Sequence, residues 1–277
     1  MEGGALWGLF VQTFKSTIKS KWLLMFTLVF FFFAFNLPFL VIQIMGLLPK
    51  NYISSYIGTL ISTTFTLMPL LALPLGAVSI VEERETGSLA FVLSTPTSRW
   101  KYLLARGAGL FAASSGIIIL GFGLAALVGF LSAGYTPGTV ALVYVTEAAL
   151  FLNATMIGIS MVISTFTRKR LTAHSLAILI WFLFTYAGAT AGAGSAISTG
   201  STYTPLIPWI LLNPVEMGRL VAVFQIPSGV ADIGITGEAI QYVFGGNALL
   251  ALLGIMAVWV GIAMAASFII FNYQDVA

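Results

Sequence analysis

The sequence predicts an all-α integral membrane protein with six transmembrane helices, and three observations support this fold class. Hydrophobic residues make up 59% of the 277 residues, charged residues make up 8%, and the mean hydropathy is +1.02. These values exclude an ordinary soluble domain. Apolar runs of roughly twenty residues, the length that a helix needs to cross a bilayer, recur along the chain, and charged residues lie mostly at their ends. We therefore treat residues 1–277 as a single transmembrane domain.

Residues 1–21 are predicted to form a helix that lies on the membrane surface. Its two faces differ in the way that interfacial helices require. The apolar face contains Trp7, Phe10, Val11, Phe14 and Ile18, and the polar face contains Gln12, Lys15, Ser16 and Lys19. The alternative is a soluble extension of the first span, but Trp7 and the basic face favour an interfacial helix.

The six predicted spans follow the apolar runs of the sequence. The second span contains Pro69 and Pro74, so it is expected to be kinked or locally unwound. The third is longer than the bilayer requires and is expected to tilt or to project beyond it. The spans are placed at residues 22–44, 57–81, 103–131, 140–165, 171–193 and 247–271.

Lysine and arginine residues are divided unequally between the two sides of the predicted membrane. With the N-terminus inside, the inner side holds Lys15, Lys19, Lys21, Arg84, Arg99, Lys101, Arg106, Arg168, Lys169 and Arg170, and the outer side holds Lys50 and Arg219. Because basic loops favour the cytoplasm, both termini are predicted to be cytoplasmic, in a multi-pass protein of the cell membrane. Segment 82–101 is then cytoplasmic too.

Segment 82–101 combines charges with a short apolar helix. Glu82, Glu83, Arg84 and Glu85 precede a break at Thr86 and Gly87, and a helix over Ser88–Ser94 carries Leu89, Phe91, Val92 and Leu93. Pro96 is expected to end this helix, and Ser98 lies where its hydroxyl can cap the next one. A half-apolar helix held outside the membrane between two spans indicates a docking surface.

This ordered run of residues resembles the signature of ABC-2-type transporter permeases after their second membrane helix. The resemblance implies a cytoplasmic coupling helix that fits a groove of a separate ATPase subunit. The residues that it assigns to ATPase coupling are Glu82, Glu83, Arg84, Glu85, Gly87, Leu89, Phe91, Leu93, Pro96, Ser98 and Arg99. Arg99 and Lys101 are candidate ion-pair partners for the carboxylates. The simpler alternative is that the charges are a solvated patch that stops the helix from sliding into lipid.

The predicted outer loop at residues 194–246 contains a helix start. Asn213 can cap, Pro214 suits the first helical position, and Glu216 follows within the first turn, before Arg219. The apolar residues Met217, Leu220, Val221 and Phe224 are expected to face the outer membrane interface, and a second helix is predicted at Glu238–Phe244. Residues 212–220 also resemble the NosY-like subgroup, which implies a transporter that supports copper-site assembly in nitrous oxide reductase.

The fifth predicted span contains small residues at a spacing that permits close helix packing. Gly188 and Gly192 lie four residues apart, and such faces let two helices approach closely. Packing within one subunit is the simpler interpretation. The family resemblance implies a dimer interface at the first and fifth spans, so we expect Gly188 and Gly192 to contact a second permease copy.

Other motifs are consistent with a subunit that lacks its own catalytic chemistry. The sequence contains no cysteine and no phosphate-binding Gly-x-x-x-x-Gly-Lys-Ser/Thr loop, so ATP and Mg²⁺ are expected to bind to the ATPase partner. His174, the single histidine, is expected to make a structural or headgroup contact rather than to bind a metal. The dispersed basic residues do not indicate a nucleic-acid partner.

Two functions of different class fit these features. The first is the permease subunit of an ATP-driven exporter. The second is a membrane scaffold that transmits force to an outer partner through residues 194–246. A secondary transporter is a more distant third, because no predicted span carries a central carboxylate or a matched acidic pair. The transported substrate is not indicated by any motif.

Overall fold

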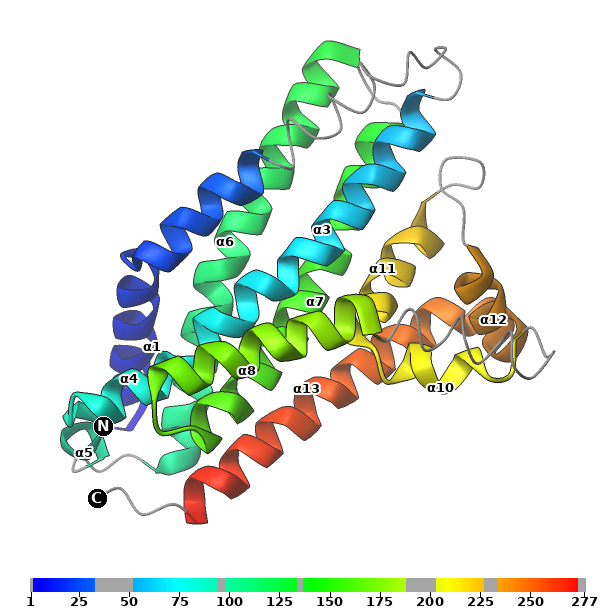
Figure 1. Cartoon of the computed structure of the whole chain (residues 1–277). Helices are drawn as coiled ribbons and strands as arrows, with labels where there is room; N and C mark the ends of the chain where they lie inside the picture. The colour runs from blue at the N-terminus through cyan, green and yellow to red at the C-terminus, as the bar shows by residue number, and fades with distance from the viewer. Residues whose placement is uncertain are drawn as a thin grey trace.

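The computed structural model describes residues 2–32, 52–93, 98–133, 137–187, 203–226 and 234–273. All regular secondary structure in these ranges is helical. The long helices run side by side as an elongated bundle, with the short helices gathered at its two ends (Figure 1). This arrangement confirms the predicted all-α fold class.

The helices follow one another along the chain with short connections. The N-terminal half contains α1 (Glu2–Ile18), an unlabelled helix at Lys21–Phe32, α3 (Tyr52–Ala77), α4 (Ser79–Glu85), α5 (Ser88–Leu93) and α6 (Arg99–Ala133). The C-terminal half contains α7 (Pro137–Phe166), α8 (Arg170–Phe182) with a π-helical end at Leu183–Ala187, α10 (Leu206–Leu211), α11 (Pro214–Gln225), α12 (Gly234–Phe244), a 3-10 turn at Gly245–Asn247, and α13 (Ala248–Tyr273).

Four helical stretches within the described ranges are long and apolar enough to cross a membrane. They are Ile57–Glu85, Arg99–Leu124, Val140–Phe166 and Gly234–Tyr273. Two shorter apolar helices, Lys21–Phe32 and Arg170–Tyr186, belong to the first and fifth predicted spans, whose remaining residues lie outside the described ranges. The six-span count therefore stays a prediction, and so does the dimer role of Gly188 and Gly192, which lie outside as well.

Helix α7 is the central element of the bundle. It packs against α3, α6, α11 and α13, and it buries Ala148, Leu152 and Met156 completely. At Gly158 an added Cβ would lie 3.2 Å from the Cβ of Ala263 on α13, so the missing side chain permits a close helix contact. A movement of α7 would therefore disturb most of the bundle.

The second predicted span is not unwound at its prolines. Helix α3 continues through Pro69 and Pro74, and the helix is interrupted only at Val78, before α4 begins. Beyond this turn the amide of Ile80 donates to the hydroxyl of Ser164 on α7, at 2.8 Å. A side chain of a neighbouring helix thus satisfies a backbone donor at the start of α4, as membrane helices require.

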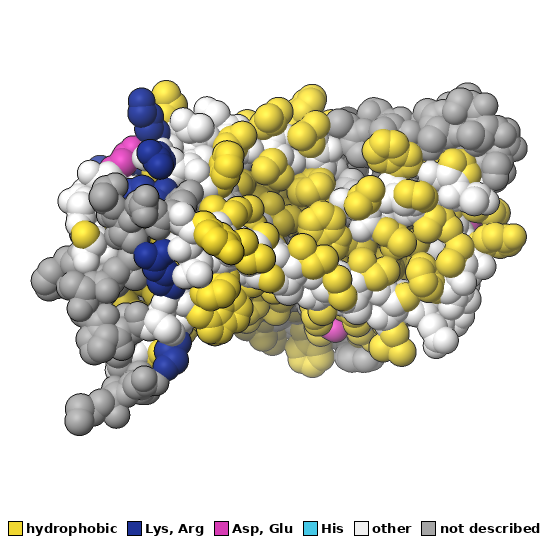
Figure 2. Space-filling model, turned by 90° about the horizontal axis from the view of Figure 1, so that it is seen from below, with side chains coloured by type: hydrophobic (Ala, Val, Ile, Leu, Met, Phe, Trp, Pro, Cys, Tyr) yellow, Lys and Arg dark blue, Asp and Glu magenta, His cyan; other side chains and the backbone are white. Residues whose placement is uncertain are grey.

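The two ends of the bundle differ in charge. Lysine and arginine side chains gather near one end of the molecule, and hydrophobic side chains cover most of the remaining length (Figure 2). We call this the basic end; it contains α1, α4, α5, the start of α6 and the α7–α8 turn (Figure 1). The opposite end contains α10, α11 and α12.

Helix α11 lies inside the bundle rather than at a membrane interface. It packs against α3, α7 and α13, and Met217, Leu220 and Val221 are fully buried. The expectation that these residues face the outer interface was therefore wrong, because a protein core accepts the same apolar helix face that a lipid interface does. Gly218 permits this packing, since an added Cβ would lie 3.0 Å from the ring of Phe65.

Candidate functional site

The charged segment predicted from sequence forms two short helices at the basic end. Helix α4 ends at Glu85, and the chain turns at Thr86 and Gly87 before α5 begins at Ser88. Gly87 has a φ of +73°, a left-handed conformation that glycine adopts without steric cost. The hydroxyl of Thr86 donates to the carbonyl of Glu82 and lies 2.9 Å from the hydroxyl of Ser88. The predicted break is thus a well-bonded turn.

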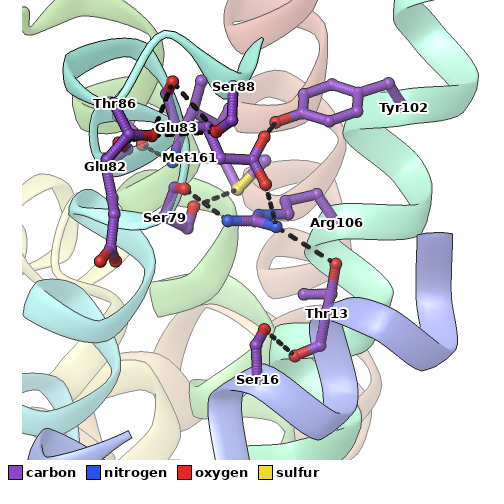
Figure 3. A network of polar contacts seen from close by, with 12 residues as sticks. Thr13, Ser16, Ser79, Glu82, Glu83, Thr86, Ser88, Tyr102, Arg106 and Met161 are labelled. Carbon is purple, nitrogen blue, oxygen red and sulfur yellow. Dashed lines mark hydrogen bonds and ion pairs between the residues drawn. The ribbon is translucent and has the colours of Figure 1, made fainter. Parts of the chain in front are cut away.

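Glu83 is the most enclosed carboxylate of α4 (Figure 3). Its Oε1 lies 2.7 Å from Nη1 of Arg106 on α6, and only 14% and 12% of the two side chains are exposed. Its Oε2 accepts a hydrogen bond from the hydroxyl of Tyr102 at 2.6 Å. Arg106 also donates to the carbonyl of Ser79 and, at 3.5 Å, to the hydroxyl of Thr13 on α1. This cluster joins α1, α4 and α6.

Arg84 connects the same helix to α7. Its Nη1 donates to the carbonyl of Thr167 at 2.6 Å, just beyond the last turn of α7, where carbonyl groups lack intrahelical partners. A cation also complements the negative end of the helix dipole. Together with the bond from Ile80 to Ser164, this contact fixes α4 to the end of the central helix.

Arg170 connects α4 to α8. Its guanidinium lies 2.8 Å from a carboxylate oxygen of Glu85 and 3.3 Å from one of Glu82, and its backbone amide donates to Glu85 at 2.9 Å. These side chains are more exposed than Glu83 and Arg106. The acidic run is therefore not simply a solvated patch, because three of its charged side chains contact other helices.

Arg99 contacts the end of α13 rather than the acidic run. Its Nη1 donates to the carbonyls of Phe271 and Asn272 at 2.8 and 2.9 Å, and its guanidinium lies 5.8 Å from the ring centre of Phe271. The expected pairing of Glu83 with Arg99 or Lys101 was wrong, because Arg106 lies closer to α4 in the folded chain. Ser98 lies directly before α6, at the position of its N-cap.

Leu89 is buried inside the chain. Only 2% of its surface is exposed, and it belongs to the main hydrophobic core, so it holds α5 against the bundle and does not face outward. Ser88 and Ala90 are exposed beside it. The side chains of Phe91 and Leu93, and Pro96 as a whole, lie outside what the structure describes. An outward face of α5 is thus available, but Leu89 is not on it.

Three residues of this site were not singled out from sequence. Tyr102, Arg106 and Arg170 contact the acidic run, and they come from the helices that follow it. Arg106 carried a signal, since it is the only charged residue of the chain between Lys101 and Glu147. A charge one turn inside a membrane helix usually has a partner.

The opposite end contains a second polar arrangement around the predicted helix start. Asn213 accepts hydrogen bonds from the amides of Val215 and Glu216 at 3.0 and 3.3 Å, which confirms the predicted cap before Pro214. Its Nδ2 donates to the carbonyl of Phe184 at 2.7 Å. The cap therefore also fixes α11 to the end of α8.

Glu216 and Arg219 form an ion pair within α11. Arg219 Nη2 lies 2.6 Å from Glu216 Oε1 and donates to the hydroxyl of Thr236 on α12 at 2.8 Å. Nearby, the hydroxyl of Tyr203 donates to Glu238 at 3.0 Å. This hydrogen bond to a carboxylate raises the pKa of Tyr203, because it favours the protonated phenol. The predicted helix at Glu238–Phe244 begins earlier, at Gly234.

Comparison with known proteins agrees with the signature in the acidic run. The sequence model described as "ABC-2 family transporter protein" matches residues 7–276. The chain is 28% identical to the probable ABC transporter permease protein NosY of Stutzerimonas stutzeri, over 96% of this chain and 98% of that protein. It is 27% identical to the protein of the same name from Pseudomonas aeruginosa, over 98% and 99%. The chain therefore belongs to the ABC-2 family of transporter proteins.

Proposed function

We propose that this chain is the permease subunit of an ATP-driven exporter. A separate ATPase subunit binds ATP and Mg²⁺, and the permease converts its movement into translocation of a substrate. The observation that carries this proposal is the attachment of α4 to four other parts of the bundle, through Glu83, Arg84, Glu85 and Arg170. A force applied to α5 reaches α6, α7 and α8 through these contacts.

The basic end is placed in the cytoplasm in this proposal, with both termini on that side. The gathering of Lys and Arg at one end (Figure 2) supports this orientation. The chain contains no cysteine, so single cysteines are specific probes. We expect Lys169→Cys to react with an impermeant thiol reagent only in permeabilised cells, and Asn247→Cys to react in intact cells. The reverse pattern would refute the orientation.

Docking of the ATPase is assigned to the exposed side of α5. Ala90 is exposed beside the buried Leu89, so Ala90→Arg adds a large charge to the docking face without disturbing the core. We expect this variant to lose co-purification with the ATPase subunit. The matched control is Asn247→Arg, which adds the same charge at an exposed position of the opposite end. Normal assembly of Ala90→Arg would exclude this face.

Coupling is assigned to the enclosed Glu83. Glu83→Gln keeps the size of the side chain but removes the charge that pairs with Arg106. We expect the complex to assemble, while stimulation of the ATPase by the permease falls by roughly fivefold to a hundredfold, the usual range of coupling between sites. Glu238→Gln, at the opposite end, is the control. Unchanged stimulation in Glu83→Gln would remove the support for a coupling role.

The permease is further proposed to work as a pair. Two copies of this chain, or this chain and a close relative, enclose the pathway between them, and two ATPase subunits bind to their basic ends. Gly188 and Gly192 remain the proposed contact between the copies. Replacing both with Leu is expected to weaken the pair by on the order of 1–2 kcal/mol, which native mass spectrometry of the purified protein measures.

A second candidate function is force transmission to an outer partner without transport, as proposed for a NosY-like subunit in copper-site maturation. The observation that favours it is the packing of α11 against α7, the helix that Arg84 contacts at the basic end. Spin labels at Tyr242→Cys, an exposed position of α12, report movement there. We expect a nucleotide-dependent distance change between copies, and unchanged distances in all nucleotide states would exclude this function.

A further inference from the structure

The basic end contains a pocket that the coupling contacts do not fill. It has a volume of about 260 Å³ and lies between α1, the helix at Lys21–Phe32, α4, α6 and α8. Its polar lining includes Ser16, Ser20, Trp22, Arg106, Arg170 and His174. The volume is larger than a few water molecules need. It therefore has room for a small polar group.

Two buried nitrogen atoms of this lining have no partner. Within the described part of the chain, Arg106 Nε and His174 Nδ1 are buried and make no hydrogen bond. An arginine Nε always carries a proton, and a histidine can carry one on either nitrogen. A buried donor without an acceptor costs roughly 1–3 kcal/mol. Both atoms therefore favour a ligand that supplies acceptor oxygens.

The surrounding backbone also favours an anion. Ser20 accepts a hydrogen bond from the amide of Leu23 at 3.1 Å, which caps the helix at Lys21–Phe32 and leaves the hydroxyl proton of Ser20 for another acceptor. Helix α8 begins at Arg170, in the same lining. The starts of two helices thus lie at the pocket, and helix N-termini attract negative charge.

The charge of the lining limits which anion fits. Glu82 also lines the pocket, at 3.3 Å from Arg170, and Arg106 is paired with Glu83. The cations are therefore largely neutralised, and hydrogen bonds rather than net charge supply the attraction. A singly charged phosphodiester suits this balance better than a doubly charged phosphate monoester does, because each added negative charge is repelled by Glu82.

Apolar surface continues from the pocket along two helices. The rings of Trp22 and His174 lie 5.7 Å apart, and beyond them Met25 and Ile178 are exposed at the next turn of each helix. On a chain of this hydropathy such exposed apolar side chains contact lipid. Acyl chains lying along this surface would bring a phosphodiester headgroup to the pocket opening.

We propose that this pocket binds the phosphodiester headgroup of a membrane phospholipid. The phosphate oxygens accept hydrogen bonds from Arg106 Nε, His174 Nδ1 and the hydroxyl of Ser20, and the acyl chains lie along Met25 and Ile178. The two unsatisfied donors are then paired, and a lipid joins α1, α6 and α8 beside the coupling contacts.

The test measures lipid retained by the full-length chain, purified from nanodiscs of phosphatidylglycerol and released for native mass spectrometry. We expect wild-type protein to retain one phospholipid per chain. His174→Phe keeps an aromatic ring against Trp22 but removes the donor, and Arg106→Lys keeps the charge beside Glu83 but removes Nε. We expect each variant to retain the lipid about tenfold more weakly, and Arg168→Lys, an exposed control outside the pocket, to behave as wild type.

Three results would overturn the proposal. The first is equal retention by wild type, His174→Phe and Arg168→Lys, where His174→Phe also answers if Arg106→Lys does not fold. The second is equal retention of diacylglycerol, which has acyl chains but no phosphate. The third is a shift in thermal unfolding by inorganic phosphate alone, in detergent and with the same dependence on His174, because that result would make a soluble anion the ligand.

Discussion

Each end of the molecule contains an ion pair between a glutamate and an arginine, but the two pairs join different parts of the chain. At the basic end, Glu83 and Arg106 come from α4 and α6, and Thr13 of α1 extends the contact. At the opposite end, Glu216 and Arg219 lie three residues apart on α11, and Thr236 extends the contact to α12. The first pair holds distant helices together, and the second mainly stabilises one helix and its neighbour.

This difference indicates how movement can pass through the bundle. The contacts of α4 reach α6, α7 and α8 through side chains, so the basic end resists separation of these helices. Helix α11 is held to α3 and α7 by apolar packing, which has no preferred direction and permits small sliding movements. A rigid end that receives force and a packed end that follows it suit a subunit of an ATP-driven transporter.

The largest expected effect comes from leaving Glu83 without its partner. In Arg106→Met the carboxylate stays enclosed and unpaired, which is expected to cost about 3–5 kcal/mol of stability. Arg219→Met should cost less, about 1–3 kcal/mol, because Glu216 and Arg219 are 21% and 28% exposed, against 14% and 12% for the pair of Glu83 and Arg106. Thermal unfolding of the detergent-purified variants measures both losses.

The double variant is the control for this prediction. Adding Glu83→Gln to Arg106→Met removes the unpaired charge and should recover part of the loss, if electrostatics is its cause. A loss at Arg219 that equals or exceeds the loss at Arg106 would contradict the proposed difference between the two ends.

The next effect concerns the close contact between α1 and α6. An added Cβ at Gly109 would lie 2.7 Å from the Cβ of Thr13 and 3.1 Å from the carbonyl oxygen of Phe10, and backbone cannot move aside cheaply. Gly109→Ala is therefore expected to destabilise the protein by about 1–3 kcal/mol. Gly218→Ala should cost less, because the ring of Phe65 at 3.0 Å can shift.

Gly116→Ala is the matched control on the same helix. Nothing lies within 4 Å of the position of its Cβ, so this variant is expected to gain up to about 1 kcal/mol from helix propensity. The unfolding midpoints of the three alanine variants should fall in the order Gly116, Gly218 and Gly109, from highest to lowest. A Gly109→Ala variant as stable as Gly116→Ala would mean that α1 is not held against α6.

Features that depend on neighbours in the sequence were predicted well. The cap at Asn213 and the turn at Gly87 were both identified from sequence, and the predicted span at 140–165 agrees closely with α7 at Pro137–Phe166. Capping side chains and glycine conformations act over two or three residues, and apolar runs fix the length of a span. These signals do not require knowledge of the tertiary structure.

Features that depend on packing between distant segments were not predicted. The partner of Glu83 was sought nearby in sequence, but it is Arg106. Leu89 was assigned to an outside groove, and Met217 to a lipid interface, yet both are buried within the chain. An apolar helix face is equally suited to lipid, to a partner and to its own core, so composition alone cannot choose between them.

A moderate effect is expected from separating the two roles of Asn213. Asn213→Asp keeps an acceptor for the amides of Val215 and Glu216 but loses the donor to Phe184. Asn213→Ala loses both roles and should cost about 0.5–2 kcal/mol for the cap, and more for the lost donor. If Asp is as unfavourable as Ala in thermal unfolding, the bond to Phe184 rather than the cap holds α11 in place.

The smallest effect on stability is expected at Arg170, although it contacts two carboxylates. Its side chain is 44% exposed, and those of Glu82 and Glu85 are 55% and 35% exposed. Exposed ion pairs contribute roughly 0–1 kcal/mol and are screened by salt, so Arg170→Gln should change the unfolding midpoint little. This change should disappear as salt is raised from low to molar concentration, whereas the loss in Arg106→Met should persist, because its pair is enclosed. A salt-insensitive loss at Arg170 would show instead that the contact between α4 and α8 is as enclosed as the contact between α4 and α6, and the basic end would then have two rigid connections.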